Sequence, residues 1–123
     1  MRKEVLSEKL TETRGLLAPE SYWKLNDDEK YEVTNGCGPE RATGLVPNSI
    51  LGVDLKPACD IHDYTYAKPS SVRVRKDADD LFLVNMHELM SRNLRSAPMR
   101  FLGTIGIGLY YLAVRLLGGH YFN

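Results

Sequence analysis

The sequence predicts a small all-α domain, and three observations lead to that prediction. The chain has 123 residues, which suits one domain over 1–123 with a modest core. Apolar residues recur at helical spacing, whereas no segment alternates apolar and polar residues convincingly as a half-buried strand does. Glycines and prolines gather between Thr34 and Lys56, so the helices are expected to surround one long, irregular loop.

The expected elements follow in chain order. Residues 1–17 form a weakly amphipathic segment, and a helix is expected to start at Ala18–Glu20, with Pro19 in its first turn. Asn26 or Asp27 then caps a short helical turn. Beyond the loop, three longer helices are expected over about 57–67, 76–93 and 99–117.

Composition limits the possible functions. The 16 basic side chains balance the 16 acidic ones, and aromatic residues are not interleaved with basic ones, so no nucleic-acid partner is expected. Charges interrupt the first 17 residues, which therefore do not resemble a secretory signal. We expect a protein that stays in the cytoplasm, leaves by a non-classical route or has lost a leader. Composition does not predict its oligomeric state.

The segment "PACDIHDYTY", residues 57–66, places four chemically capable side chains along one helix: Cys59, His62, Asp63 and Tyr66. Positions three and four apart lie side by side on a helix, but adjacent residues point about 100° apart. His62 and Asp63 are therefore expected to serve different partners. The alternative interpretation is a hydrogen-bonded core histidine beside a solvated aspartate.

One carboxylate of the next helix falls within its apolar stripe. Asp79 projects among the apolar residues, whereas Asp77 lies outside them and Asp80 near their edge. A buried, ionised carboxylate is costly unless it is paired, so Asp79 needs a donor from a neighbouring helix. The stripe comprises Ala78, Phe82, Leu83, Met86, Leu89 and Met90, and the candidate donors are His62, Tyr66, Tyr110 and Tyr111. The alternative is that Asp79 only caps its helix.

The loop "TNGCGPERATG" offers oxygen ligands to a hard cation. Carbonyls at Gly36, Cys37 and Gly38, with the Asp63 carboxylate, would suit Ca²⁺, which takes about six to eight oxygen ligands. Zinc fits less well, because HExxH and CxxC spacings are absent and the three histidines are scattered. Cys37 and Cys59 either form a disulfide that ties this loop to the helix or remain two buried thiols.

The strings "NGCG", "ACDIHDYTY" and "ADDLF" together resemble the phospholipase A2 superfamily, in particular its small bacterial, fungal and parvoviral-type members. The family pattern is Cys, two residues, His-Asp, two residues, Tyr, and it matches the segment from Cys59 to Tyr66. The resemblance covers about residues 35–90. This chain departs from the pattern in the loop, where Pro39, Glu40 and Arg41 replace the expected further glycines.

The resemblance implies a role for each matching residue. His62 would be the general base that activates water, Asp79 would orient it, and Tyr66 would hydrogen-bond to Asp79. Asp63 would ligate Ca²⁺ together with main-chain oxygens near Gly36 and Gly38 and with Asn35. The implied fold is the small helical phospholipase A2 domain, with its calcium loop before the active-site helix.

The implied reaction is Ca²⁺-dependent hydrolysis of the sn-2 ester of glycerophospholipids at a membrane surface, without a covalent acyl-enzyme. The alternative is a catalytically weak or inactive domain of the same fold with a structural, interaction or membrane-binding role. A third possibility is an esterase or toxin acting on a different lipid.

The last helix carries an apolar run from Phe101 to Val114, followed by Arg115. This run is shorter than the roughly 20 residues that span a bilayer, so a core helix packed on the two preceding helices is expected. The alternative is that part of it faces lipid. A further set of basic residues is expected to form a solvated face, or to attract anionic headgroups: Arg73, Arg75, Lys76, Arg92, Arg95 and Arg100.

Overall fold

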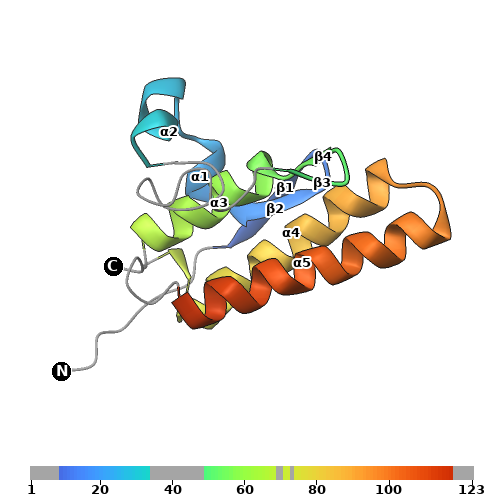
Figure 1. Ribbon diagram of the computed structural model, residues 1–123. Helices are drawn as coiled ribbons and strands as arrows, with labels where there is room; N and C mark the ends of the chain where they lie inside the picture. The colour runs from blue at the N-terminus through green and yellow to red at the C-terminus, as the bar shows by residue number, and fades with distance from the viewer. Residues whose placement is uncertain (1–8, 34–48, 69–70, 73, 118–123) are drawn as a thin grey trace.

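The computed structural model describes residues 9–33, 49–68, 71–72 and 74–117 (Figure 1). The prediction of an all-α domain is wrong, because two small antiparallel sheets of two strands each accompany the helices. The elements are β1 (Leu10–Thr13), β2 (Leu16–Pro19), α1 (Glu20–Trp23), α2 (Asp27–Val33), β3 (Ser49–Ile50), β4 (Val53–Asp54), α3 (Lys56–Ala67), α4 (Arg75–Asn93) and α5 (Ala97–Leu117).

Each sheet is a hairpin closed by a two-residue turn that ends in glycine. Arg14 and Gly15 join β1 to β2 with φ of 57° and 84°, and Leu51 and Gly52 join β3 to β4 with φ of 54° and 80°. Two successive positive φ values are the geometry of a type I′ turn, whose twist suits paired strands. The strands have four and two residues, too few for their alternation to appear in the sequence. The remaining signal for these hairpins in the sequence was the glycine in each turn, Gly15 and Gly52.

The short helices begin close to where the sequence predicts. Pro19 ends β2 and α1 starts one residue later, so Pro19 precedes the first turn. Asn26 caps α2, as predicted: its Oδ1 accepts from the Glu29 amide at 2.8 Å, and Glu29 Oε1 accepts from the Asn26 amide at 2.9 Å. This reciprocal pair is a capping box, which fixes the start of a helix only seven residues long.

The three long helices match their predicted ranges to within two residues at each end. Leu94 is extended after α4, and Ser96 Oγ accepts from the Met99 amide at 3.3 Å at the start of α5. α4 packs against α3 and against α5, and α5 runs beside α4 as its antiparallel neighbour (Figure 1). The expectation that α5 packs on both preceding helices therefore holds mainly for α4 among the described residues.

The main core lies where α3, α4 and β2 meet. One polar side chain crosses it: Asn85 of α4 is fully buried, accepts from the Leu17 amide at 2.8 Å and donates to the Leu17 carbonyl at 2.8 Å. The side-chain amide thus behaves as an additional strand partner and attaches the first hairpin to α4. The apolar stripe predicted on α4 is confirmed, since its members are buried except Leu83, which is partly buried.

Candidate active site

The centre of the candidate site is a hydrogen bond between α3 and α4. His62 Nε2 lies 2.8 Å from Asp79 Oδ1, so the contact predicted from the misplaced carboxylate is present. The Asp79 side chain is fully buried and that of His62 is 10% exposed. Asp79 is the fifth residue of α4, beyond the positions that cap a helix, so the capping alternative is wrong.

Tyr66 donates its hydroxyl to the same carboxylate oxygen, at 2.5 Å from Asp79 Oδ1. Tyr66 lies one turn after His62 on α3, which places both side chains over one position of α4. The His62 ring is also held by its aromatic neighbours, with centroids 4.3 Å from Tyr66 and 4.3 Å from Phe82, and it stacks on Phe82 at 20°. These contacts fix the plane of the imidazole.

Two arginines hold the other oxygen of the carboxylate. Arg115 Nη1 from α5 lies 2.9 Å from Asp79 Oδ2, and Arg75 Nη1 lies 3.5 Å from it. Arg75 also donates to the Val114 and Arg115 carbonyls at 2.9 Å each, and thereby binds the end of α5. The prediction that Arg75 belongs to a solvated face is wrong.

These donors determine the charge of Asp79. Burial alone would raise the pKa of the Asp79 carboxyl, but hydrogen bonds from His62, Tyr66 and Arg115 lower that pKa below its ordinary value. Burial and the bond to Asp79 raise the pKa of Tyr66, so its phenol stays protonated. The site therefore contains an ionised acceptor surrounded by donors. A histidine that donates through Nε2 carries its lone pair on Nδ1, where it can accept a proton.

The two tyrosines of α5 do not contribute to this cluster. The Tyr111 hydroxyl donates to Asp80 Oδ1 at 2.6 Å. The Tyr110 hydroxyl is buried and has no hydrogen-bond partner within the described part of the chain, and burial raises its pKa to about 12. Of the four candidate donors, His62 and Tyr66 therefore bond to Asp79 in the described structure, and these two tyrosines do not. From this side of the carboxylate, Arg75 and Arg115 contact Asp79 instead.

The predicted Ca²⁺ site lies largely outside the described residues. Asp63 is partly exposed on α3, near Tyr22, whose pKa is raised to about 12 by burial and by the charges of Asp60 and Asp63. The other predicted ligands, Asn35, Gly36 and Gly38, fall outside the described ranges, as does Cys37. Within those ranges no group of three or more His, Cys, Asp or Glu side chains could hold a metal. A site built mainly from carbonyls would not form such a group.

Cys59 is buried, with 2% of its surface exposed. There is no free cysteine among the described residues. The pairing of Cys59 with Cys37 stays a prediction.

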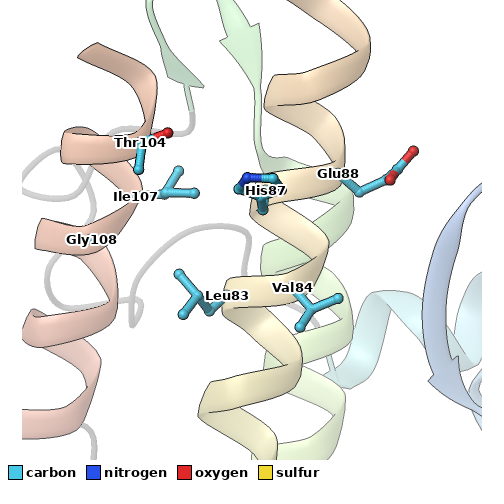
Figure 2. A pocket seen from close by; sticks show the side chains of 7 residues that line it. All are labelled: Leu83, Val84, His87, Glu88, Thr104, Ile107 and Gly108. Carbon is cyan, nitrogen blue, oxygen red and sulfur yellow. The ribbon is translucent and has the colours of Figure 1, made fainter. Parts of the chain in front are cut away.

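A separate groove lies between α4 and α5 (Figure 2). Its volume is about 540 Å³, and none of His62, Tyr66 or Asp79 lines it. Leu83, His87 and Glu88 line it from α4, and the Glu88 carboxylate points away from α5. The remaining lining residues are Val84, Thr104, Ile107 and Gly108.

Sequence reasoning missed three members of the candidate site: Arg75, Phe82 and Arg115. Phe82 was placed in the apolar stripe, without the stack on His62. Arg115 had a signal, because it is the one charged residue in the second half of an apolar helix. Such a residue needs an acidic partner, as Asp79 needs donors.

Comparison of the chain with protein-family models finds no match, and comparisons with curated proteins and with solved structures find none either.

Proposed function

We propose that this protein is a phospholipase A2-type ester hydrolase with His62 as its general base. The observation that supports the proposal is the buried Nε2–Oδ1 bond of 2.8 Å between His62 and Asp79, with Tyr66 on the same carboxylate. A carboxylate that accepts from one imidazole nitrogen orients the ring and favours its protonated form. The other nitrogen can then take a proton from water.

The reaction proceeds in two proton transfers. His62 Nδ1 takes a proton from a water molecule while that water attacks the carbonyl carbon of the sn-2 ester. The imidazolium that forms is stabilised by the Asp79 carboxylate, which stays ionised because its pKa is lowered. The tetrahedral intermediate then expels the glycerol oxygen, which receives the proton from His62. The products are a fatty acid and a lysophospholipid.

Ca²⁺ is the implied cofactor, and Asp63 with the carbonyls of Gly36 and Gly38 and with Asn35 would hold it. When bound, the cation would neutralise the substrate phosphate and the developing oxyanion. Asp63 follows His62 directly on α3, and its partly exposed side chain can reach outward while the imidazole points to α4. This placement supports separate roles for the two residues.

The alternative of an inactive domain is favoured by one observation. Arg75 and Arg115 both approach Asp79 Oδ2, which is the arrangement expected of a buried ion pair that holds α5 in place. In that case His62 is one more donor to a structural carboxylate. The same contacts are compatible with catalysis, so activity decides between the two functions.

Fatty-acid release from phosphatidylcholine–phosphatidylglycerol vesicles tests the proposal, with Ca²⁺ and with chelator. His62→Gln is expected to reduce the rate by about 10²–10⁴-fold, the range typical of a lost general base. Lys24→Gln is the control, because the Lys24 side chain is exposed at the end of α1, outside the His62–Asp79 cluster, and its loss should leave the rate unchanged. No release with Ca²⁺, or equal release by wild type and His62→Gln, contradicts the proposal.

Calorimetric titration with Ca²⁺ tests the cofactor separately. Binding that is present in wild type and lost in Asp63→Asn supports the assignment of Asp63. Binding that is unchanged in Asp63→Asn, or absent from wild type, contradicts it. Hydrolysis that persists in chelator would assign the chemistry to the protein alone.

A further inference from the structure

The outward side of α5 carries a row of large apolar side chains. Six of them are between 48 and 73% exposed: Phe101, Leu102, Ile105, Leu109, Leu112 and Leu116. Most of the steps along this row are three or four residues, so the side chains share one side of the helix. A contiguous exposed apolar surface is typical of an interaction site.

The opposite side of α5 is fixed to α4, so the row cannot turn inward. A Cβ added at Gly103 would lie 2.9 Å from Leu94 Cδ1, and Ile107 and Tyr110 are buried. Only 17% of the window Ala97–Leu116 is buried, although the window is long and apolar enough to cross a membrane by length and composition. The predicted run Phe101–Val114 is thus part of a longer apolar segment.

The apolar surface continues onto α4. Val84 is 51% exposed and lines the groove between the helices together with Thr104 and Gly108 of α5 (Figure 2). In the described structure a Cβ built at Gly108 would have no other atom within 4 Å, apart from the neighbouring residues and the backbone of its own helix. The exposed area is therefore wider than one row of side chains.

Positive charge exceeds negative charge around this surface. α5 contains two arginines, Arg100 and Arg115, and no acidic residue. Arg92 and Arg95 add positive charge at the corner between α4 and α5, where the nearby Glu88 pairs with Arg92 at 3.5 Å. This end of the surface therefore has an excess of positive charge, which complements anionic headgroups.

We propose that α5 docks on the surface of a membrane containing anionic phospholipid. The helix lies parallel to the membrane, with its apolar row in the boundary between headgroups and acyl chains. The inference rests on the proposed function for its choice of a lipid surface. The helix contributes the apolar contact, and the arginine-rich corner contributes the attraction to the headgroups.

Two other arrangements fit the structure less well: a second copy of the chain on this surface, and a helix that spans the membrane. A second copy would place α5 against α5, and α5 has no carboxylate to pair with the arginine-rich corner of its partner. A spanning helix would have to leave α4. It would then lose the packing of Gly103 against Leu94, expose the buried Tyr110 and break the 2.9 Å bond between Arg115 and Asp79.

Docking on this side also bears on the candidate active site. Arg115 joins α5 to the Asp79 carboxylate, and Arg75 donates to the carbonyls of the last turns of α5. The docking helix and the His62–Asp79 pair are therefore parts of one connected structure. A membrane that orients α5 orients this pair with it.

Co-sedimentation with vesicles tests the proposal in chelator, so that hydrolysis does not proceed. The full chain is mixed with vesicles of phosphatidylcholine alone or of equimolar phosphatidylcholine and phosphatidylglycerol, and the bound fraction is measured. Stronger binding to the anionic vesicles is expected. Leu109→Glu should weaken that binding by about tenfold or more, because it replaces a large apolar contact. Arg95→Glu should reduce the preference for the anionic vesicles.

Tyr31→Glu is the matched control, because Tyr31 is 85% exposed on α2 and outside the surface. It should bind like wild type, as should His62→Gln, so a failed hydrolase proposal stays distinguishable from failed docking. Absence of wild-type binding, or equal binding by Leu109→Glu, overturns the inference. Resistance of the bound protein to alkaline carbonate would indicate a spanning helix and overturn it too. So would a dimer by sedimentation velocity that Leu109→Glu dissociates without affecting vesicle binding.

Discussion

Asp79 and Asp80 are neighbours on α4 with similar partners and opposite surroundings. Asp79 is fully buried and accepts from Tyr66, His62 and Arg115. The Asp80 side chain is 43% exposed and accepts from Tyr111 at 2.6 Å and from Lys76 at 2.7 Å. Each carboxylate thus has a tyrosine and a cation, but only one of them is removed from water.

Burial is what separates a candidate site from a surface ion pair. Water competes for the partners of Asp80 and screens its charge, so its bonds contribute little to the free energy of folding. Around Asp79 the protein must supply every donor, and each donor is thereby held in one orientation. General-base catalysis requires an oriented imidazole. Of the two carboxylates, Asp79 is the one that holds a histidine.

The largest difference is expected in activity. Asp79→Asn removes the acceptor charge that orients the His62 ring, so fatty-acid release should fall by about 10²-fold or more. Asp80→Asn should retain the wild-type rate within about twofold, because Asp80 contacts neither His62 nor Tyr66 in the described structure. Initial rates on vesicles with Ca²⁺ provide the measurement. Equal losses in both variants would remove the distinction between the two carboxylates.

Stability should separate the same two residues. Asp79→Ala leaves His62, Tyr66 and Arg115 without their common acceptor, and breaking such a buried pair costs about 3–5 kcal/mol in the free energy of unfolding. Asp80→Ala should cost about 0.5 kcal/mol, as for an exposed pair. Urea denaturation followed by circular dichroism measures both values. A cost for Asp80→Ala that matches that of Asp79→Ala would show that burial is not the cause.

The pH dependence of stability sharpens this result. The folded-state pKa of Asp79 is lowered, so its stabilisation is fully present above its unfolded pKa of about 3.9 and is lost as pH falls through the lower folded value. The stability difference between wild type and Asp79→Asn should therefore shrink as pH falls below about 3.9 and Asp79 takes up a proton. Urea midpoints at several pH values test this, with Asp80→Asn as the control. A difference that grows in acid would contradict the direction of the shift.

The sequence predicted this site because its main signal is local. A charge within a helical apolar stripe is visible from spacing alone, and so are the neighbours of His62 on its own helix. Arg75 and Arg115 were missed because their long side chains reach Asp79 from positions set by the packing of α5. The groove between α4 and α5 also depends on that packing.

The fold shows the same limit. α3, α4 and α5 are long enough for their periodicity to be read, whereas β3 and β4 have two residues each and follow from the turn at Leu51 and Gly52. Strands this short depend on turn geometry and on neighbours rather than on alternation. Asn85 is a further case, because its bonds to Leu17 join residues 68 positions apart.

The smallest expected difference lies between the two tyrosine hydroxyls that donate to the two carboxylates. Tyr66→Phe removes a buried hydrogen bond to an ionised group, which should lower the free energy of unfolding by about 1.5–3 kcal/mol. Tyr111→Phe removes the bond to Asp80, whose oxygen water can reach, so a change within about 0.5 kcal/mol is expected.

Thermal and urea denaturation of the two variants, compared with Tyr110→Phe, measure this difference. Tyr110 buries its hydroxyl without a partner in the described structure, so Tyr110→Phe should leave stability unchanged or raise it. If Tyr110→Phe and Tyr66→Phe were equally destabilising, the lost packing of a buried hydroxyl, and not a lost hydrogen bond, would explain both results. The ranking Tyr66, Tyr111, Tyr110 would instead assign the effect to the acceptor that each hydroxyl reaches, and to the burial of that acceptor.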